Sequence, residues 1–332
     1  MRTVLAVNPT YLGVEAILVE EGASLPDASG RWVFPPGTCD FAAIEREAGI
    51  PPSLVAIPGG TYKPSEPGVY LINEKMASEA SEIDPFHPRN RLTVLAYRYC
   101  SERRVPGIVV EPMNTGKLLL EAEVSGLAEH RRRGVYYALP QRHAWEDSCR
   151  KLGLPLTARG ITAYLGEESC VSSHIGDEVV DTSDPVLGEG PFGLTAAGTL
   201  PAGGFLAYLA ERPGSELVST LKTSAGAFGY AKTRTLPELE LALSRGDEKA
   251  ARAVSAMGYQ VAKEIGRQAV ALSGKVDIIV LCGAGVRLSA LRNRIEELSR
   301  KWAEVTVYKE TTPDLLIAKG TAVLRGEALK EY

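Results

Sequence analysis

Three glycine-containing turns follow apolar segments of the chain, and turns of this kind can bring backbone N–H groups close to an anion. The first is the turn Asn8-Pro9-Thr10-Tyr11-Leu12-Gly13, between two apolar runs. Gly166 follows a second apolar run in "AYLGEES", and Gly283 and Gly285 follow a third in "VLCGAG". Glycine has no Cβ, so backbone donors can approach a phosphate at these positions. A plain strand-to-helix turn explains Gly283 and Gly285 equally well, because a G-x-G pattern alone is weak evidence.

Side chains that could hold a metal ion are scattered along the chain. The four histidines and five cysteines show no CxxC pair and no metal-ligand spacing. The odd, unclustered cysteines fit a reduced cytoplasm better than a disulfide framework. Asp181 and Asp184 follow an apolar run, where Asx-turns explain them at least as well as a binding role. Lys117, Lys222 and Lys232 are candidate cations, and their spacing selects none of them.

The elements that must position these residues begin with a repeated pattern. Residues 3–7 and 14–19 are expected to form strands joined by the opening turn. Residues 160–166 are expected to form a strand that continues into a second strand-turn-strand unit, and this echo suggests a duplicated fold. Apolar residues at helical spacing predict a long helix over about 247–271: Ala250, Val254, Met257, Val261, Ile265 and Ala269.

Helices and strands alternate in the remaining chain. A helix is expected over about 89–103, a buried strand over 107–110 that ends at Glu111, and a closing helix in "DLLIAKGTAVLRGEAL". The alternation predicts an α/β fold. At 332 residues the chain is longer than a typical single core, so two domains are expected.

Composition and charge exclude several classes of partner. The net charge is −4, and no sustained basic stretch occurs, which argues against nucleic acid or an anionic membrane as the partner. The run Arg131-Arg132-Arg133 is expected to be a solvated loop. No apolar stretch reaches the roughly 20 residues that span a bilayer, and the N-terminal residues show no secretory signal. A cytoplasmic protein is therefore expected.

Longer stretches of the chain carry a family resemblance. They are "PGVYLINEKM", "VSGLAEHRRRGVYYALP", "GEGPFGLTAAGTLPAGG", "GDEKAARAVSAMGYQVAKEIG" and "KVDIIVLCGAG". In these stretches, their order and their spacing, the chain resembles the butyrate kinases, of the acetate/butyrate kinase group within the actin-like ATPase superfamily. The resemblance implies two actin-like (ribonuclease H-like) domains with a central cleft, one over residues 1–157 with a C-terminal helix 313–332 and one over 158–312. It also implies a homodimer formed through the second domain.

The resemblance further implies a reaction and its site. Butyrate kinases use ATP and Mg²⁺ to convert a small carboxylate to an acyl phosphate, so small carboxylates and nucleotides are the implied ligands. Glu111 matches an acid that holds the metal or orients the acceptor, and Tyr137 matches a transition-state histidine. The positions that match the nucleotide and phosphate contacts are Asn8, Gly166, Gly198, Thr199, Gly283 and Gly285.

The chain departs from the family where charge matters most. Pro58 and Ala197 replace two arginines, and Tyr137 replaces the histidine. An arginine on a transferring phosphoryl group is worth about 10³ to 10⁵ in rate, so ordinary butyrate kinase turnover is not expected. Glu167 and Glu168 replace glycines that face the phosphates, where two carboxylates repel a triphosphate unless metal or arginine intervenes. The alternative is a turn that projects both carboxylates into solvent.

The opening turn departs as well. Tyr11 and Leu12 replace small residues, and together with Glu167 and Glu168 they are expected to fill the space of the β- and γ-phosphates. ATP is therefore expected to bind weakly or not at all in the usual pose. Residues 311–313 replace a metal-binding Asn-Glu-Glu, so no metal ligand is assigned. Two functions stay open: a divergent carboxylate kinase, and a non-catalytic relative that serves nucleotide sensing or partner binding.

Overall fold

The computed structural model describes residues 2–10, 12–23, 28–211 and 220–332 and divides into two compact units. Unit 1 consists of Met1–Thr115 with Glu310–Tyr332, and unit 2 of Gly116–Lys309. Within the described ranges, no helix combines the length and the apolar character that crossing a membrane requires. Each unit is built around one β-sheet, and each is described separately below.

The sheet of unit 1 has six strands in the order β3-β2-β1-β4-β6-β5. Strand β1 pairs antiparallel with β2 and parallel with β4, so it connects the β1–β2 hairpin to the parallel part of the sheet. The strands are β1 (Thr3–Pro9), β2 (Val14–Glu20), β3 (Gly30–Phe34), β4 (Leu54–Pro58), β5 (Val69–Leu71) and β6 (Gly107–Val110). The expected hairpin and the expected strand over 107–110 are thus confirmed.

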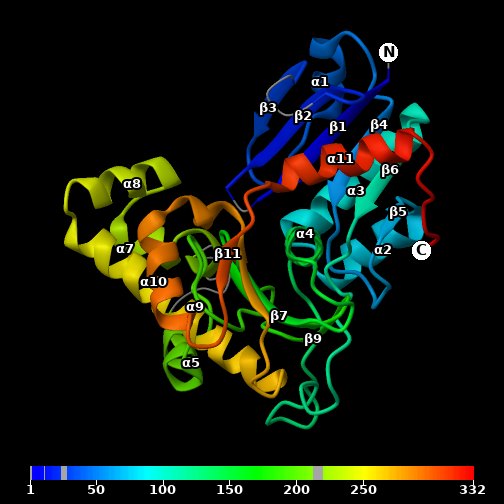
Figure 1. The fold of residues 1–332 in the computed structure, drawn as a ribbon. Helices are drawn as coiled ribbons and strands as arrows, with labels where there is room; N and C mark the ends of the chain where they lie inside the picture. Colours follow the sequence, from blue (N-terminus) through cyan, green and yellow to red (C-terminus); the bar gives the residue numbers. More distant parts are fainter. Residues whose placement is uncertain (1, 11, 24–27, 212–219) are drawn as a thin grey trace. The chain divides into compact units, whose positions relative to one another are not determined.

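The described helices of unit 1 are α1 (Phe41–Ala48), α2 (Glu74–Ile83), α3 (Pro88–Arg103) and α11 (Thr312–Leu324). Helix α11 lies across the sheet in Figure 1 and contacts β1 and β4. It begins at a capping box between Thr311 and Asp314. The contact is close at Gly320, where an added Cβ would lie 2.5 Å from Val4 and 3.3 Å from Leu54.

The C-terminal segment is only partly helical. Helix α11 ends at Leu324, whereas the sequence suggested a helix to the last residue. Gly326 has a φ of 104°, a conformation that ends a helix. The chain then extends, and the Lys330 N–H donates to the carbonyl of Val69 at 2.8 Å, beside β5.

The sheet of unit 2 has five strands in the order β11-β10-β7-β8-β9. The strands are β7 (Arg159–Leu165), β8 (Ser169–Ile175), β9 (Glu178–Thr182), β10 (Ile278–Cys282) and β11 (Val305–Val307). Strand β7 pairs antiparallel with β8 and parallel with β10, as β1 pairs with β2 and β4 in unit 1. The two sheets therefore share one strand arrangement, which confirms the α/β class and the expected duplication.

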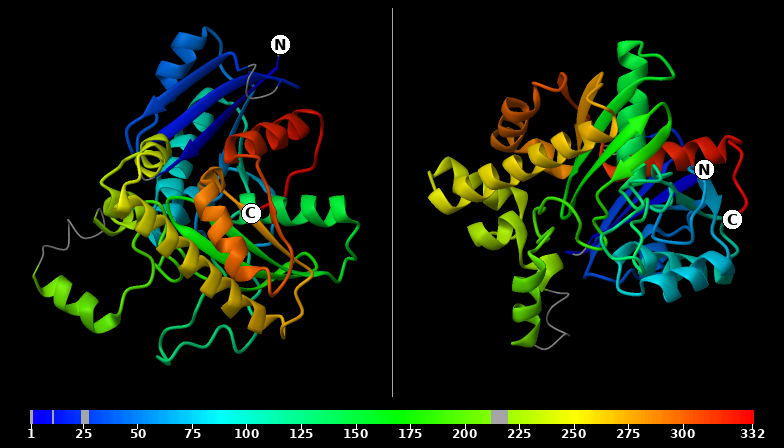
Figure 2. Two further views of the ribbon diagram at one scale, coloured as in Figure 1. Left: turned by 60° about the vertical axis from the view of Figure 1, so that its left-hand side comes forward. Right: turned by 90° about the horizontal axis from the view of Figure 1, so that it is seen from below.

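The longest helix of unit 2 has the register that the sequence predicts. The described helices of this unit are α4 (Ala138–Leu152), α5 (Ala202–Ala210), α7 (Gly226–Ala231), α8 (Leu236–Ser244), α9 (Glu248–Ala271), the 3-10 turn η2 (Ala284–Arg287) and α10 (Ser289–Ser299). Asp247 caps α9 by accepting from the N–H groups of Lys249 and Ala250. All six apolar positions named above on α9 are buried. Figure 2 shows α10 beside α9, and the two helices are in contact.

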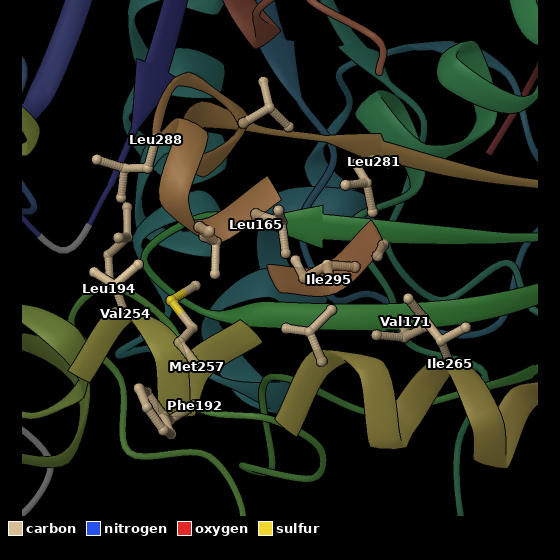
Figure 3. Packing of buried hydrophobic residues seen from close by; sticks show 14 of the residues in the cluster. Leu165, Val171, Phe192, Leu194, Val254, Met257, Ile265, Leu281, Leu288 and Ile295 are labelled. Atoms are coloured by element: carbon tan, nitrogen blue, oxygen red, sulfur yellow. The ribbon is translucent and has the colours of Figure 1, made fainter. Parts of the chain in front are cut away.

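The core of unit 2 lies between α9 and one face of the sheet (Figure 3). Ile161 and Leu165 of β7 belong to the cluster that includes Val254 and Met257 of α9. Successive residues of a strand point to opposite faces, and Thr162 correspondingly bonds Gln141 of α4 at 2.7 Å. Helix α4 thus covers the other face.

The unit boundary follows from this packing. Helix α4 contacts β7 and β10, and residues 116–157 group with unit 2 for that reason. The sequence predicts a boundary after residue 157, which would place residues 116–157 in the N-terminal domain, and this domain division stays a prediction.

Candidate functional site

Thr10 forms hydrogen bonds within the opening turn. Thr10 Oγ1 accepts from the N–H groups of Leu12 and Gly13, at 3.1 Å each, and the Thr10 N–H donates to the Gly13 carbonyl at 2.8 Å. Asn8 is half-buried at the end of β1, Leu12 is exposed, and Tyr11 lies outside the described residues. A phosphate that accepted hydrogen bonds from the N–H groups of Leu12 and Gly13 would have to displace the Thr10 hydroxyl.

Glu111 lies at the end of β6 in a strained backbone conformation. Its φ is 53°, in the left-handed region that costs a non-glycine residue about 1 kcal/mol or more. The side chain is buried, and Oε2 accepts from the Gly68 N–H at 3.1 Å, while the Glu111 N–H donates to the Gly68 carbonyl at 2.9 Å. Its catalytic role stays a prediction, and the strain marks it as a position where function is worth testing.

The glycines of the two turns in unit 2 meet around one aromatic ring. A Cβ on Gly166 would lie 2.5 Å from the Tyr164 ring, and a Cβ on Gly283 would lie 2.9 Å from it. Gly283 also has a φ of 89°, and a Cβ on Gly285 would lie 2.9 Å from Leu165 Cβ. These glycines are required for the packing of Tyr164 and Leu165. Their nucleotide contacts stay a prediction.

Glu168 is buried in the turn between β7 and β8 and makes two strong contacts. Its side chain is only 2% exposed. The Tyr137 hydroxyl donates to Oε2 at 2.6 Å, and the Lys222 ammonium forms an ion pair with Oε1. Tyr137 precedes α4 and stacks on Tyr164, with ring centroids 4.3 Å apart. The alternative in which this turn projects both glutamates into solvent is therefore wrong for Glu168, while Glu167 is half-buried.

Lys222 is the lysine that this structure selects among the three candidates. Besides Glu168, its ammonium donates to the carbonyls of Pro185 and Val186 at 2.9 and 3.2 Å. Its side chain is largely buried, whereas Lys117 forms an exposed pair with Glu178 and Lys232 is exposed. An ammonium group carries three protons and no acceptor, so it can donate to several oxygens at once.

A cavity of about 530 Å³ opens beside this ion pair within unit 2. Glu168 and Lys222 lie in its wall, and most of the remaining lining is apolar: Pro185, Val186, Leu187, Pro191, Ala196, Ala197, Leu200, Phe205 and Leu221. Its volume is in the range of small-molecule sites. Ala197, which stands where the resemblance places an arginine, thus contributes apolar surface.

Gly198 and Thr199 line the same cavity and hold its rim together. The Thr199 hydroxyl accepts from the Gly190 N–H at 2.8 Å, and the Thr199 N–H donates to the Gly190 carbonyl at 2.9 Å. Gly198 has a φ of 64°, and a Cβ there would lie 2.6 Å from the backbone nitrogen of Phe192. Both residues are therefore needed for the shape of the cavity.

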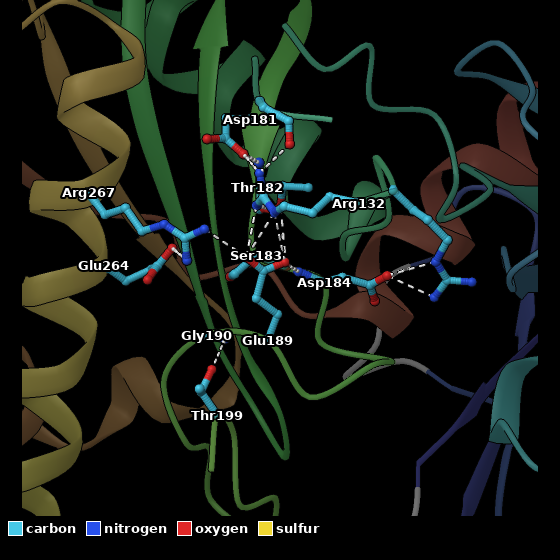
Figure 4. A network of polar contacts seen from close by, with 12 residues as sticks. Arg132, Asp181, Thr182, Ser183, Asp184, Glu189, Gly190, Thr199, Glu264 and Arg267 are labelled. Atoms are coloured by element: carbon cyan, nitrogen blue, oxygen red, sulfur yellow. Dashed lines mark hydrogen bonds and ion pairs between the residues drawn. The ribbon is translucent and has the colours of Figure 1, made fainter. Parts of the chain in front are cut away.

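A network of ion pairs holds Glu189, a residue of the cavity wall (Figure 4). Arg132 pairs with Asp181 and Glu189, both at 2.9 Å, and Arg267 of α9 pairs with Glu189 at 2.8 Å. Glu189 lines the cavity. Burial alone would lower the pKa of the Arg132 guanidinium, but Glu189 and Asp181 raise it above its usual value. Arg132 is thus a largely buried partner of two carboxylates, so the expectation of a solvated loop holds for Arg131 alone.

Arg133 extends the network to the loop after β9. Its guanidinium pairs with Asp184 at 2.7 Å, and Asp184 Oδ1 accepts from the N–H groups of Val186 and Leu187. The expected Asx-turn is present, and it carries an ion pair as well. Burial raises the pKa of Asp184, although Arg133 and the two N–H groups oppose the shift. The loop that supplies two carbonyls to Lys222 is therefore held at both ends.

The described residues provide no protein site for a metal ion. Within the four described ranges, no three His, Cys, Asp or Glu side chains gather as a metal ion requires. All five cysteines are unpaired. Mg²⁺ therefore has no set of protein ligands here, although Mg²⁺ is commonly carried into a site on nucleotide phosphates.

Sequence reasoning missed Lys222 as the partner of Glu168 and Arg132 as the partner of Glu189. These pairs are separated by 54 and 57 residues, so local spacing gives no signal for them. The signal that existed was the position of Arg132 and Arg133 inside one of the family-like stretches, "VSGLAEHRRRGVYYALP".

Comparison with known proteins supports one family. No family model matches the chain. The chain is 32% identical over 282 residues to a protein described as a probable butyrate kinase from Listeria monocytogenes serotype 4b (strain CLIP80459). That alignment covers 82% of this chain and 79% of the relative. A probable butyrate kinase from serovar 1/2a (strain ATCC BAA-679 / EGD-e) is 31% identical over the same length and with the same coverage.

Two solved structures share the fold. The acetate kinase of Porphyromonas gingivalis superposes with a TM-score of 0.76 at 16% identity, covering 98% of this chain and 100% of that chain. A propionate kinase from Francisella tularensis subsp. tularensis SCHU S4 gives a TM-score of 0.74 at 14% identity, covering 96% and 99%. These similarities confirm the actin-like α/β fold class that the sequence predicted. With the sequence identity to the Listeria proteins, they lead to one conclusion: the chain belongs to the butyrate kinase family.

Proposed function

We propose that this protein is a divergent carboxylate kinase that uses ATP to convert a small carboxylate to an acyl phosphate, with butyrate a poor substrate. Membership of the butyrate kinase family supports the reaction class. The observation that carries the proposal for this chain is Lys222, a largely buried cation in the wall of a cavity of ligand size.

Electrostatics explains why this lysine matters. Phosphoryl transfer to a carboxylate brings two anions together, so catalysis depends on positioned cations and backbone donors. Pro58 and Ala197 supply no charge where the resemblance places arginines. In the proposed site Lys222 supplies the charge and Tyr137 supplies a hydroxyl donor, while the loop 184–189 holds Lys222 in place.

ATP would bring triphosphate charge, and Mg²⁺ would neutralise part of it when bound. The residues that the structure describes do not form a set of ligands for Mg²⁺, so no step of the proposal runs through the metal. The opening turn is closed on itself through Thr10, which supports weak nucleotide affinity in the usual pose.

The test is an acyl phosphate assay over a panel of acids. The protein is incubated with ATP, Mg²⁺ and linear, branched or aromatic carboxylates, and acyl phosphate is trapped with hydroxylamine. The expected result is slow hydroxamate formation from an acid other than butyrate, lost in Lys222→Met. Absence of hydroxamate with every acid, from a protein shown to be folded, would contradict the proposal.

A second candidate is a non-catalytic relative that binds a nucleotide or a partner. The observation that favours it is the Glu168–Lys222 pair, because it neutralises the one buried lysine that the cavity wall contains among its described residues. Calorimetry with ATP and ADP, with and without Mg²⁺, separates the candidates. Nucleotide binding without any acyl phosphate would favour the second.

Two further expectations remain part of the proposal. A homodimer through unit 2 is expected from the family, but the apolar stripe of α9 is buried inside the unit and offers no surface for it. Helix α5 has apolar side chains and no buried residue, so it supports the same proposal from another surface. Light scattering at tens of micromolar would decide it. A cytoplasmic location and the absence of nucleic acid and membrane partners likewise stay predictions.

A further inference from the structure

The buried carboxylate of Glu168 has the surroundings of a bound anion. It receives a hydroxyl hydrogen bond from Tyr137 on one oxygen and the Lys222 ammonium on the other. Both donors come from segments far from Glu168 in the sequence, and each also makes a contact that does not involve Glu168. Tyr137 stacks on Tyr164, and Lys222 is held by the carbonyls of Pro185 and Val186.

We infer that Lys222 and Tyr137 form a binding site for one small oxyanion, and that Glu168 fills this site with its own carboxylate. The site has the two features that oxyanion recognition requires, a cation and a neutral hydroxyl donor converging on one group. It opens onto the cavity, whose wall includes both Glu168 and Lys222. The ligand class is a carboxylate or a phosphate, since either presents two oxygens to such a pair.

Glu168 thereby sets the charge that the cavity accepts. While its carboxylate is in place, Lys222 is neutralised, and a second anion would meet apolar walls and a negative charge. An anionic ligand must displace Glu168, or Glu168 must be replaced, before the lysine becomes available. Glu168 is on this basis a specificity-determining residue, and the inference concerns binding, so failure of the kinase assay leaves it standing.

The experiment compares anion binding by wild type and by Glu168→Ala. Thermal shift and calorimetry are carried out with sodium acetate and with sodium phosphate, at ionic strength held constant with sodium chloride. Glu168→Ala is expected to bind acetate, phosphate or both at least about tenfold more tightly than wild type, the gain of one charge-assisted hydrogen bond. The same anion is expected to recover the melting temperature that the variant loses. The two arms show whether the site prefers carboxylate or phosphate.

Two further variants make the result decisive. Glu168→Ala/Lys222→Met is expected to lose the gain in anion affinity, because the cation is gone. Glu178→Ala is the matched control, since it also removes a carboxylate from a lysine, Lys117 at 3.1 Å, but at an exposed site. It is expected to gain no affinity.

The inference is overturned if folded Glu168→Ala gains no affinity for either anion, or if Glu178→Ala gains as much. If Glu168→Ala does not fold, Glu168→Gln replaces it, because glutamine removes the charge that pairs with Lys222 and is therefore displaced more easily by an anion. Glu168→Gln is then expected to bind the anions more tightly than wild type, and an unchanged affinity would overturn the inference.

Discussion

The hydroxyl of Tyr137 donates a 2.6 Å hydrogen bond to Glu168 while its ring stacks on Tyr164 at a centroid distance of 4.3 Å. Tyr137 thus links the start of α4 to the turn between β7 and β8 through one polar and one aromatic contact. The two contacts can be separated by substitution.

Tyr137→Phe keeps the ring and removes the hydroxyl. A hydrogen bond to a charged group is worth about 1.5–3 kcal/mol, so the free energy of unfolding is expected to fall by about 2 kcal/mol. Tyr137→Leu also removes the stacking and should cost roughly 1 kcal/mol more. Urea denaturation of the three proteins measures both steps. Equal stability of wild type and Tyr137→Phe would show that the hydroxyl contributes nothing.

Arg132 and Arg131 are neighbours with opposite environments, with side chains 15% and 82% exposed. Arg132→Met leaves Asp181 and Glu189 without a buried cation and is expected to destabilise the protein by about 3 kcal/mol. Arg131→Met removes an exposed pair and should change stability by less than about 0.5 kcal/mol. Denaturation midpoints give the comparison. Similar losses from both variants would mean that the network in Figure 4 is not what stabilises this loop.

Gly198 and Gly246 have similar backbone conformations, with φ of 64° and 75°. A Cβ on Gly198 would lie 2.6 Å from the nitrogen of Phe192, whereas a Cβ on Gly246 meets nothing within 4 Å. Gly246→Ala therefore reports the backbone strain alone, about 1 kcal/mol, and Gly198→Ala should cost clearly more. Thermal unfolding separates them. Equal shifts in melting temperature would show that the cavity rim relaxes around the methyl group.

His174 is fully buried, and burial with the charge of Arg142 lowers its pKa to about 3 from a usual 6.5. Between those pH values the unfolded chain binds a proton that the folded protein does not. The stability contribution is therefore present above about pH 6.5 and is lost as the pH falls, by up to about 1.4 kcal/mol per pH unit.

His174→Gln cannot titrate and should lack this component of the pH dependence. The test is chemical denaturation at pH 7, 6 and 5, with the difference between wild type and variant plotted against pH. The difference is expected to shift in favour of the variant as the pH falls. A constant difference would mean that the pKa of His174 is the same in the folded protein and in the unfolded chain.

Butyrate activity should not return when one arginine is restored. Pro58→Arg and Ala197→Arg each replace one missing charge, but Thr10 still closes the opening turn and Glu168 still holds Lys222. Neither variant, nor wild type, is expected to give detectable butyryl phosphate in the hydroxylamine assay. Robust product from wild type would show that the altered turns still position ATP.

Local sequence patterns predicted much of the secondary structure and the duplicated arrangement of the sheets. The spacing of Ala250, Val254 and Met257 gave the buried face of α9, because a helix repeats every 3.6 residues whatever it packs against. The alternation of strands and turns likewise gave the two related sheets. Both inferences rest on patterns formed by residues that are close together in the sequence.

The site was much less predictable. Whether Glu168 faces solvent or Lys222 depends on where the loop 184–189 and residue 222 come to lie, which no local pattern specifies. Arg132 is similar, since a run of three arginines is usually solvated and only tertiary packing buried its middle member. A charged side chain that is buried requires a partner, and the tertiary fold determines which residue that partner is.

The placement of α11 has a consequence for synthesis on the ribosome. Strands β1 and β4 are made early, but the helix that packs on Val4 and Leu54 begins at Thr312, after the whole of unit 2. Unit 2 is continuous in sequence and can fold as soon as it emerges. In unit 1 the sheet face that α11 covers stays exposed until α11 has been synthesised. We therefore expect a chaperone to bind unit 1 of the nascent chain rather than unit 2.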